Sequence, residues 1–384
     1  MFGSIYIGLS GLSAYSRGLQ QISNNVANLN SQGFKSSTVT FQNLLGTGSV
    51  GGNGVRTAAS RTDFAQGELR QTDRDLDLAV QGSGFLMLMR GDETRYTRTG
   101  SFEVDKDGFI VLTGTDYRLA ALDEAGQPVG ISVDSSRTSM PKATAKIAFA
   151  DNLSSTATKT VAVSDIAVYD ANGQKYVWKI SFDKNTAAGS NVWTVKVTDD
   201  KGTSYDTQTL KFNTGGIVDP STSTLTFAKA ELGLSVVLDF SVGVSSYSGG
   251  DVSTLRAASV DGYGVGTLTT VTVNDKGKIE VGYSNSQKKE LGSVVVADFR
   301  DPDDLEQQTG GLFVDKDGTQ RSLLASGDVR AGTVQARRLE ASNVDLTLEF
   351  SDLILVQRGF QASSQIISVT NDMIQQLFGI RGQG

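Results

Sequence analysis

Residues 343–378 read NVDLTLEFSDLILVQRGFQASSQIISVTNDMIQQLF, and this stretch decides how the C-terminal part of the chain folds. Every seventh position from 346 onward is apolar, namely Leu346, Leu353, Phe360, Ile367 and Ile374. Further apolar residues accompany this line at Phe350, Val356, Met373 and Leu377. Five successive heptads of this kind predict a long helix with a coiled-coil seam. Asn343 is a residue type that caps helices, so we expect the helix to begin directly after it.

The first thirty residues carry a similar apolar line at Ile5, Leu12, Leu19 and Val26, joined by Leu9, Tyr15, Ile22 and Leu29. This spacing predicts a second amphipathic helix of about four turns or more. Arg17 is the single charged residue in this segment, although a helix with a solvated outer face normally carries more charge. Two alternatives stay open. The terminal helices either pair within one chain on a β body, or stay poorly ordered until they pack against copies of themselves.

Between about residues 35 and 340, short segments rich in Val, Thr, Ile, Phe and Tyr alternate with Gly, Asp and Asn. Such segments flank Asp107-Gly108, Asn172-Gly173 and Lys201-Gly202, which predicts antiparallel hairpins, with a type I′ turn at Asp-Gly. The Gly/Ser-rich residues 44–60 predict a compliant linker. The expected fold class is therefore mainly β with helical termini. Two antiparallel β domains, barrel- or sandwich-like, are threaded between helices that form a coiled-coil domain.

The pattern divides the chain into four expected parts. Residues 1–30 and 343–384 form the terminal helical domain, and residues 31–72 with 330–342 form a connecting region. Residues 73–144 with 251–329 form a first β domain, and residues 145–250 form an outer β domain.

The composition excludes several classes of site. The chain has 384 residues and neither histidine nor cysteine, so zinc and haem ligation, Ser-His-Asp or Cys-His catalysis and disulfides lose their usual residues. Its 35 basic and 42 acidic residues give a net charge of −7, which argues against a nucleic-acid partner. The first positive side chain is Arg17, and no apolar run approaches about 18 residues. We therefore expect a soluble protein without a cleaved leader or membrane insertion.

Acidic motifs in the chain are better explained by turns than by chemistry. Residues 105–108 and 315–318 both read DKDG and resemble the start of a calcium loop. Gly114 and Leu324 stand where the bidentate glutamate of such a loop belongs, so both motifs predict hairpin turns. The acidic residues within 301–306 predict a solvated loop rather than a catalytic carboxylate pair. No catalytic, cofactor-binding or metal-binding residue is expected, and no cofactor.

Four segments resemble the bacterial flagellar rod and hook protein family. The N-terminal signature consists of residues 10–14 (SGLSA), 22–28 (ISNNVAN) and 33–35 (GFK). The C-terminal signature consists of residues 340–346 (EASNVDL) and 357–362 (QRGFQA). Residues 81–85 (QGSGF) and 96–102 (YTRTGSF) are similar to segments of the family's first β domain. The chain departs from the family pattern at Ser31 and at Ser363-Ser364, but small side chains are kept where close packing is expected.

The resemblance implies a structural subunit rather than an enzyme, and the length favours a hook-type subunit over the shorter rod type. Such subunits polymerise into a curved hollow tube at the cell surface that acts as a flexible universal joint between motor and filament. Implied partners are copies of the chain, the distal rod, hook cap, length-control and hook–filament junction proteins, and the flagellar type III export apparatus. A distal rod-type protein and, in another class, a secreted β-rich adhesin or glycan-acting enzyme are the alternatives.

Two sets of residues follow for the expected site. The inter-subunit helical seam comprises Ile5, Leu9, Leu12, Leu19, Ile22, Val26, Leu346, Phe350, Leu353, Phe360, Ile367, Ile374 and Leu377. The family signature comprises Asn24, Asn25, Ala27, Asn28, Gly33, Phe34, Lys35, Asn343, Asp345, Gln357 and Arg358.

Overall fold

The computed structural model describes residues 2–45, 52–123, 125–189, 191–316 and 319–381, and it divides the chain into two compact units. The first unit comprises Met1–Ser135, Val271–Val281 and Lys289–Gly384. The second unit comprises Ser136–Thr270 and Gly282–Lys288. The four-part division expected from the sequence is finer than this and stays a prediction.

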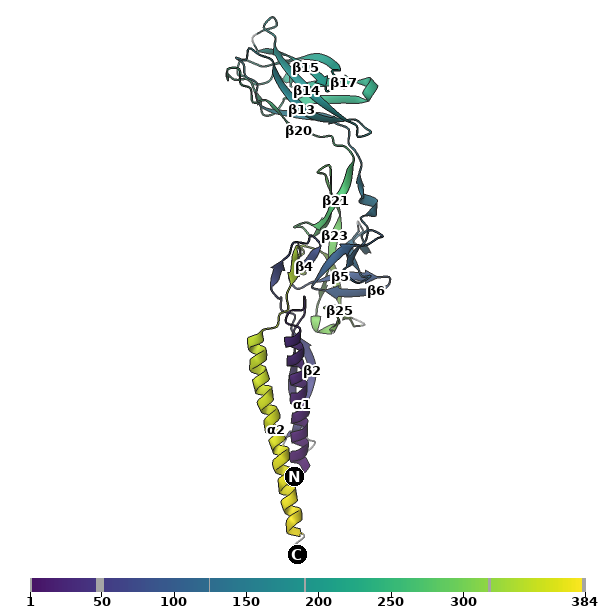
Figure 1. The fold of residues 1–384 in the computed structure, drawn as a ribbon, viewed down its shortest axis with the longest axis vertical. Helices are drawn as coiled ribbons and strands as arrows, with labels where there is room; N and C mark the ends of the chain where they lie inside the picture. The colour runs from purple at the N-terminus through teal and green to yellow at the C-terminus, as the bar shows by residue number, and fades with distance from the viewer. Residues whose placement is uncertain (1, 46–51, 124, 190, 317–318, 382–384) are drawn as a thin grey trace. The chain divides into compact units, whose positions relative to one another are not determined.

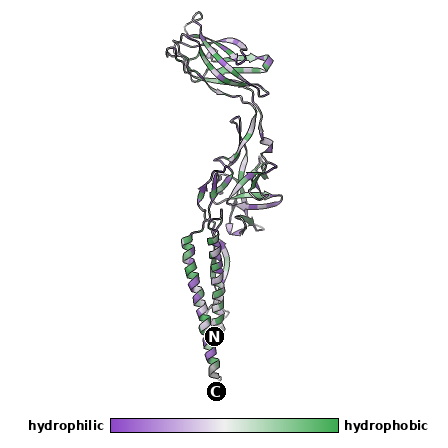
Figure 2. Ribbon diagram, viewed as in Figure 1, coloured by the Kyte–Doolittle hydropathy of each residue, from purple (hydrophilic) through white to green (hydrophobic). Residues whose placement is uncertain are grey.

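Both α-helices belong to the first unit. They are α1 (Phe2–Ala27) and α2 (Leu346–Arg381), and they lie side by side with opposite chain directions (Figure 1). Apolar residues recur along both helices, as the heptad spacing predicts (Figure 2). The predicted fold class, mainly β with helical termini, is confirmed.

A β-hairpin packs against α1 where the sequence predicts a linker. Strands β1 (Ser37–Leu45) and β2 (Gly52–Thr62) pair antiparallel, while residues 46–51 lie outside the described part of the chain. The linker prediction is wrong for residues 52–60 because they form part of β2, which pairs with β1. Gly54 has a φ of 108°, and a Cβ there would lie 2.4 Å from Ser10 Oγ, which accepts a hydrogen bond from Val55 N at 3.1 Å.

The β body of the first unit is built mainly from one large, mostly antiparallel sheet in which 15 strands are connected. Its strands are β4 (Asp77–Gln81), β5 (Phe85–Arg90), β6 (Glu93–Thr97), β7 (Thr99–Val104), β8 (Ile110–Leu112), β9 (Arg118–Leu122), β10 (Pro128–Gly130), β24 (Leu305–Gln308), β25 (Leu312–Asp315), β26 (Arg321–Ala325) and β27 (Thr333–Ala336), with β21 (Gly266–Val273), β22 (Lys278–Tyr283) and β23 (Lys288–Phe299), which have residues in both units, and β11 (Thr138–Ser139), which belongs to the second unit. Strands β3 (Leu69–Gln71) and β28 (Arg338–Glu340) form a separate antiparallel pair.

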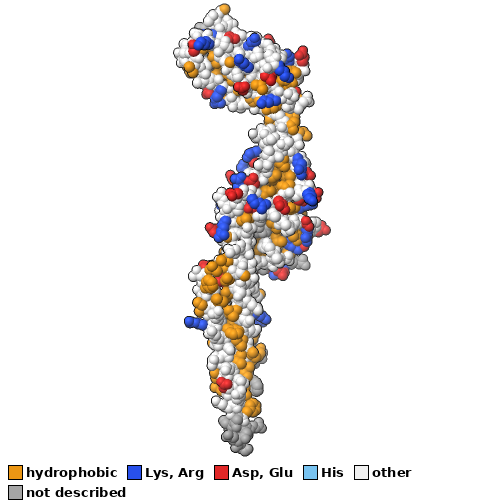
Figure 3. All heavy atoms as spheres, in the orientation of Figure 1, with side chains coloured by type: hydrophobic (Ala, Val, Ile, Leu, Met, Phe, Trp, Pro, Cys, Tyr) orange, Lys and Arg blue, Asp and Glu red, His pale blue; other side chains and the backbone are white. Residues whose placement is uncertain are grey.

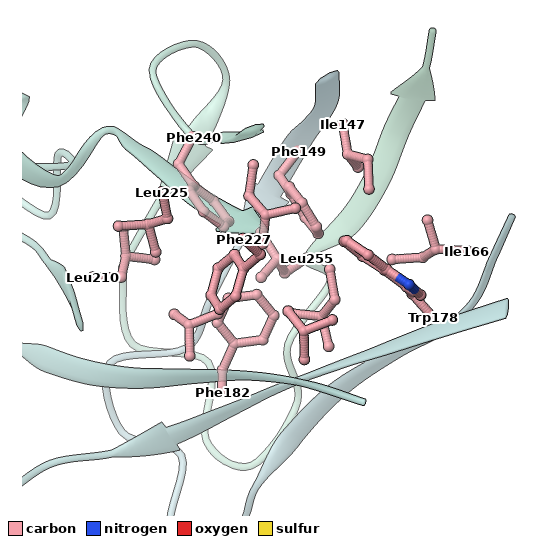
Figure 4. Close-up of a cluster of buried hydrophobic side chains, with 14 of the residues drawn as sticks. Ile147, Phe149, Ile166, Trp178, Phe182, Leu210, Leu225, Phe227, Phe240 and Leu255 are labelled. Carbon is pink, nitrogen blue, oxygen red and sulfur yellow. The ribbon is translucent and has the colours of Figure 1, made fainter. Parts of the chain in front are cut away.

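The second unit contains two further sheets. One is the antiparallel meander β13 (Val161–Tyr169), β14 (Lys175–Lys184), β15 (Val192–Asp199) and β16 (Ser204–Lys211). The other comprises β12 (Lys146–Asn152), β17 (Thr224–Lys229), β18 (Leu234–Asp239), β19 (Val244–Ser245) and β20 (Arg256–Val260). Side chains from both sheets, including Phe149, Trp178, Phe182, Phe227 and Phe240, point toward one another in one buried core (Figure 4). The described strands form open sheets and no closed barrel.

The hairpin turns use an aspartate side chain in place of the predicted type I′ geometry. Asp105 Oδ1 accepts hydrogen bonds from Asp107 N at 2.9 Å and Phe109 N at 2.7 Å. Gly108 alone in this turn has a positive φ, 77°, whereas a type I′ turn needs positive φ at both central residues. The geometry is therefore a type I turn followed by a left-handed glycine, and Asp170–Gly173 and Asp199–Gly202 repeat it. Residues 317–318 of the second DKDG motif lie outside the described residues.

Candidate functional site: the helical pair and its anchor

The two helices approach so closely that their contact requires small side chains. A Cβ added to Gly11 would lie 2.7 Å from Ser363 Oγ, and one added to Gly359 would lie 2.4 Å from Tyr15 Cζ. Position numbers rise along α1 as they fall along α2, which makes the pair antiparallel. Ser363 is buried against Gly11, which agrees with the close packing expected at Ser363-Ser364, whereas Ser364 is exposed and does not pack in this contact.

The structure divides the predicted seam into two groups. Nine of its residues are buried or half-buried, namely Ile5, Leu12, Leu19, Ile22, Val26, Leu346, Leu353, Ile367 and Ile374. The other four, Leu9, Phe350, Phe360 and Leu377, are exposed. The first group shows that much of the heptad line is shielded within one chain, because α1 and α2 pair with each other. The role of either group between subunits stays a prediction.

A second apolar face of α2 is exposed and was not included in the predicted seam. It consists of Leu348, Leu355, Ile366, Val369 and Met373, of which Leu348 is 65% and Leu355 66% exposed. At about 100° per residue these five lie on one side of the helix, whereas the exposed Ile354 and Phe378 lie on other sides. Figure 3 shows apolar side chains along the surface of the helical pair, with few charged ones among them. The missed signal is a second line at heptad spacing through Leu348, Leu355 and Val369. Contiguous apolar surface of this kind marks an interaction site.

Asn25 joins α1 to both of its neighbours. Its Nδ2 donates to the carbonyl of Ser37 on β1 at 2.9 Å and to Glu349 Oε1 on α2 at 2.8 Å. Its Oδ1 accepts from Ser37 N at 3.1 Å, and the residue is 1% exposed. A buried amide with these partners fixes the position of the helix relative to the hairpin and to α2.

A buried charge cluster joins the segment that follows α1, which carries Lys35, to the segment that precedes α2, which carries Glu340. Lys35 Nζ lies 2.6 Å from Glu340 Oε1, and Arg98 Nε lies 3.4 Å from Glu340 Oε2. Lys35 also donates to the carbonyl of Ala65 at 2.7 Å, and the Arg98 guanidinium donates to the carbonyls of Gly82 and Gly84. All three charged side chains are 1% exposed or less. Burial lowers the pKa of Lys35 and of Arg98, more than the attraction of Glu340 raises it.

Asn343 and Asp345 have different roles from those expected. Helix α2 begins at Leu346, and Asp345 Oδ1 caps it by accepting from Thr347 N at 2.8 Å. The prediction that Asn343 caps the helix is wrong, because the chain at 343 is still paired with the segment after α1. Asn343 Oδ1 accepts from Ser36 N at 2.8 Å, and its Nδ2 donates to the carbonyl of Asp63 at 2.8 Å.

Some of the remaining signature residues shape the chain after α1, and others are exposed. Asn28 ends α1 by donating from Nδ2 to the carbonyl of Asn24 at 2.9 Å, and Gly33 turns the chain with a φ of 66° before the buried Phe34. The exposed residues of the signature are Asn24, Ala27, Asp345, Gln357 and Arg358. Sequence reasoning missed Glu340 and Arg98 as site residues, although both lie within the quoted signature segments.

Neither described helix is long and apolar enough to cross a membrane. Among the described residues, no group of three or more Asp, Glu, His or Cys side chains is placed to hold a metal ion.

Three family profiles match successive parts of the chain, at its N-terminus, in its first β region and at its C-terminus. "Flagella basal body rod protein" matches residues 5–35, and "Flagellar hook protein FlgE/F/G D1 domain" matches residues 79–152. "Flagellar basal body rod FlgEFG protein C-terminal" matches residues 335–380. The first profile covers most of α1 and includes Lys35, and the last covers most of α2 and includes Glu340, whereas Arg98 lies within the D1-domain profile.

Curated relatives match over nearly the whole chain. The flagellar hook protein FlgE of Treponema pallidum is 29% identical over 99% of this chain and 100% of the relative. The FlgE proteins of Salmonella typhimurium and Escherichia coli are 29% and 28% identical, over 97% of this chain and 98% of each relative. Among solved structures, Helicobacter pylori FlgE2 aligns with a TM-score of 0.51 and 13% identity, over 71% of this chain and 99% of that chain, which concerns the fold alone.

Proposed function

The chain belongs to the flagellar rod and hook protein family and is a structural subunit of the flagellar hook, and we propose that its helical pair is the surface through which copies polymerise. The hook is an extracellular part of the flagellum. The observation that carries the proposal is the exposed apolar face of α2 next to a helix contact that is already close-packed. Small residues bring α1 and α2 into close contact, and this contact leaves the exposed face of α2 uncovered. Burial of that face therefore requires a further partner.

The proposed polymer is a curved hollow tube in which the helical pairs form the inner layer and the β units lie outside. The tube acts as a flexible universal joint that transmits torque from motor to filament. The chain reaches the surface through the flagellar type III export apparatus without leader cleavage. One end of the tube contacts the distal rod. The hook cap, length-control and hook–filament junction proteins are the other partners of the tube. These finer statements rest on family membership together with the exposed helical face.

Substituting Leu348→Asp tests the proposal. Leu348 lies on this face of α2 and is 65% exposed, so a carboxylate there is tolerated by the isolated chain but would be desolvated when copies pack. We expect the purified variant to fold and to remain unassembled where the wild-type chain forms tubes, as measured by sedimentation and electron microscopy. Val242→Asp is the matched control, because Val242 is an exposed apolar residue of the second unit. Tubes formed equally by wild type and Leu348→Asp would refute the role of this face.

A further inference from the structure

A pocket of about 440 Å³ lies between α1, β1 and α2, within the first unit. Tyr15, Phe41 and Val356 give it apolar walls, while Glu349 and Asp352 place two carboxyl groups at its lining. No basic side chain lines it among the described residues. The pocket therefore offers apolar contact together with uncompensated negative charge.

Glu349 is the more constrained of the two carboxyl groups. It is 8% exposed, and Asn25 donates to its Oε1 at 2.8 Å, while its Oε2 has no hydrogen bond among the described residues. Burial raises the pKa of Glu349, the hydrogen bond from Asn25 opposes this, and the charge of Asp352 adds to the rise. A cation that entered the pocket would compensate both acids and satisfy the free oxygen.

Arg358 is the cation that the helical pair offers to a neighbour. It is exposed on α2, and the described residues provide it with no hydrogen bond or ion pair. Arg17 and Arg56, by contrast, donate to Thr57 and Gln42. At about 100° per residue, Arg358 lies about half a turn around α2 from Glu349, so a chain cannot place it in its own pocket.

Arg358 stands on a ridge formed with Ile354 and Ala362, each one helical turn away. Both neighbours are exposed, so the ridge presents one guanidinium flanked by apolar groups. This matches a pocket whose walls are apolar and whose charge is negative. Arginine suits such a site because its planar group can pair with two carboxylate oxygens at once.

We propose that the Arg358 ridge of one copy enters the pocket of a second copy, where its guanidinium pairs with Glu349 and Asp352. This inference rests on the proposed function, because it names the partner surface within the same polymer. A ridge and a pocket on different faces of one chain form a heterologous contact. Repetition of such a contact gives a ring where its rotation closes and an open helical array where it does not, and a tube requires the second case.

A charge exchange tests the contact in the full chain. Arg358→Asp and Asp352→Arg each place like charges together, which opposes association strongly. We expect each single variant to raise the critical concentration for assembly at least about tenfold, and the double variant to assemble at lower concentration than either. Asp372→Arg combined with Arg358→Asp is the matched control, since Asp372 is an exposed acid of α2 outside the pocket lining, and it should give no rescue. Circular dichroism of each unassembled variant verifies folding.

The outcomes separate this contact from the proposed function. Wild-type assembly by Arg358→Asp would overturn the contact while the polymerisation of the helical pair stands. A double variant no better than its parents would overturn it too, because the two charges would then not meet. Wild-type chain that forms no polymer, or tubes that tolerate Leu348→Asp, would instead refute the proposed function on which the contact rests.

Discussion

Replacing Glu340 with Gln removes the negative charge at the centre of the buried cluster and nearly preserves its shape. Glu340 Oε1 accepts from Lys35 Nζ at 2.6 Å and from Gly67 N at 2.8 Å, and Oε2 faces Arg98. Removing one partner of a buried ion pair costs about 3–5 kcal/mol, because the remaining charge stays desolvated. Gln keeps one acceptor oxygen, so we expect the lower end, about 3 kcal/mol.

The stability of each unit can be measured separately, because helical circular dichroism reports on the first unit and tryptophan fluorescence on the second. Both described α-helices lie in the first unit, whereas both tryptophans, Trp178 and Trp193, lie in the second. In urea unfolding of the unassembled chain, we expect Glu340→Gln to shift the circular dichroism transition at 222 nm and to leave the tryptophan fluorescence transition unchanged. Glu68→Gln is the matched control. Its side chain is 72% exposed beside Arg70, so its loss should cost under about 1 kcal/mol.

The pH dependence provides a second, independent check of the same substitution. Burial already holds the pKa of Lys35 below its ordinary 10.5, and loss of Glu340 removes the attraction that opposes this. A cation whose folded pKa is lowered gives up its proton more readily in the folded state, so stability rises with pH between the two pKa values. The deficit of Glu340→Gln should therefore shrink as the pH is raised from 7 toward 10. A deficit below about 1 kcal/mol at pH 7, or one that grows with pH, would refute the account of the cluster.

Two further substitutions test the helix contact and the second unit. Gly359→Val crowds Tyr15 and should lower the stability of the first unit by about 1–3 kcal/mol in the 222 nm transition, and an unchanged transition would contradict the close approach. Asp239→Asn addresses a carboxyl whose pKa burial acts to raise, but which hydrogen bonds from Lys146 and Ser241 hold at about 2. Its deficit in tryptophan-monitored stability should be about 2 kcal/mol at pH 7 and should vanish as the pH falls from 3.8 toward 2, whereas a pH-independent deficit would exclude this cause.

The parts of the fold that depend on short-range pattern were predictable from sequence. The heptad line through Leu353 and Ile367 predicts α2 because helical periodicity is written into neighbouring residues. The hairpin at Asn172-Gly173 is found for the same reason, since a turn needs few residues and a glycine with positive φ. The type I′ geometry predicted at Asp107-Gly108 is wrong because the Asp105 side chain stabilises a different turn with the same glycine.

The features that were predicted wrongly or missed depend on contacts between segments that are distant in the sequence. Lys35 and Glu340 are separated by 305 positions, and nothing in either local sequence shows that both are buried. The glycines of 52–60 indicate flexibility by composition, yet Gly54 is needed where the hairpin meets Ser10 on α1. Asn343 has the right residue type for a cap, but its side chain is already bonded to the segment that follows α1. In each case a long-range partner overrides the local preference.

The anchor also bears on where a polymer of this chain would be stiff. Here the anchor means Asn25, Asn343 and the Lys35–Glu340–Arg98 cluster. Under the proposed function, torque on the helices reaches the β body of the first unit through the cluster, because Arg98 lies between β6 and β7. Asn25 and Asn343 hold the helices to β1 and to the segment that follows α1. Apolar residues of similar volume could stabilise this junction equally well, so stability alone does not explain three buried charges. The ion pairs and hydrogen bonds of the cluster can form in only one alignment of the segments that carry Lys35, Arg98 and Glu340, whereas apolar packing would allow these segments to shift. The anchor is therefore suited to fix the angle of the helical pair, and compliance must come from elsewhere than residues 52–60, which form strand β2.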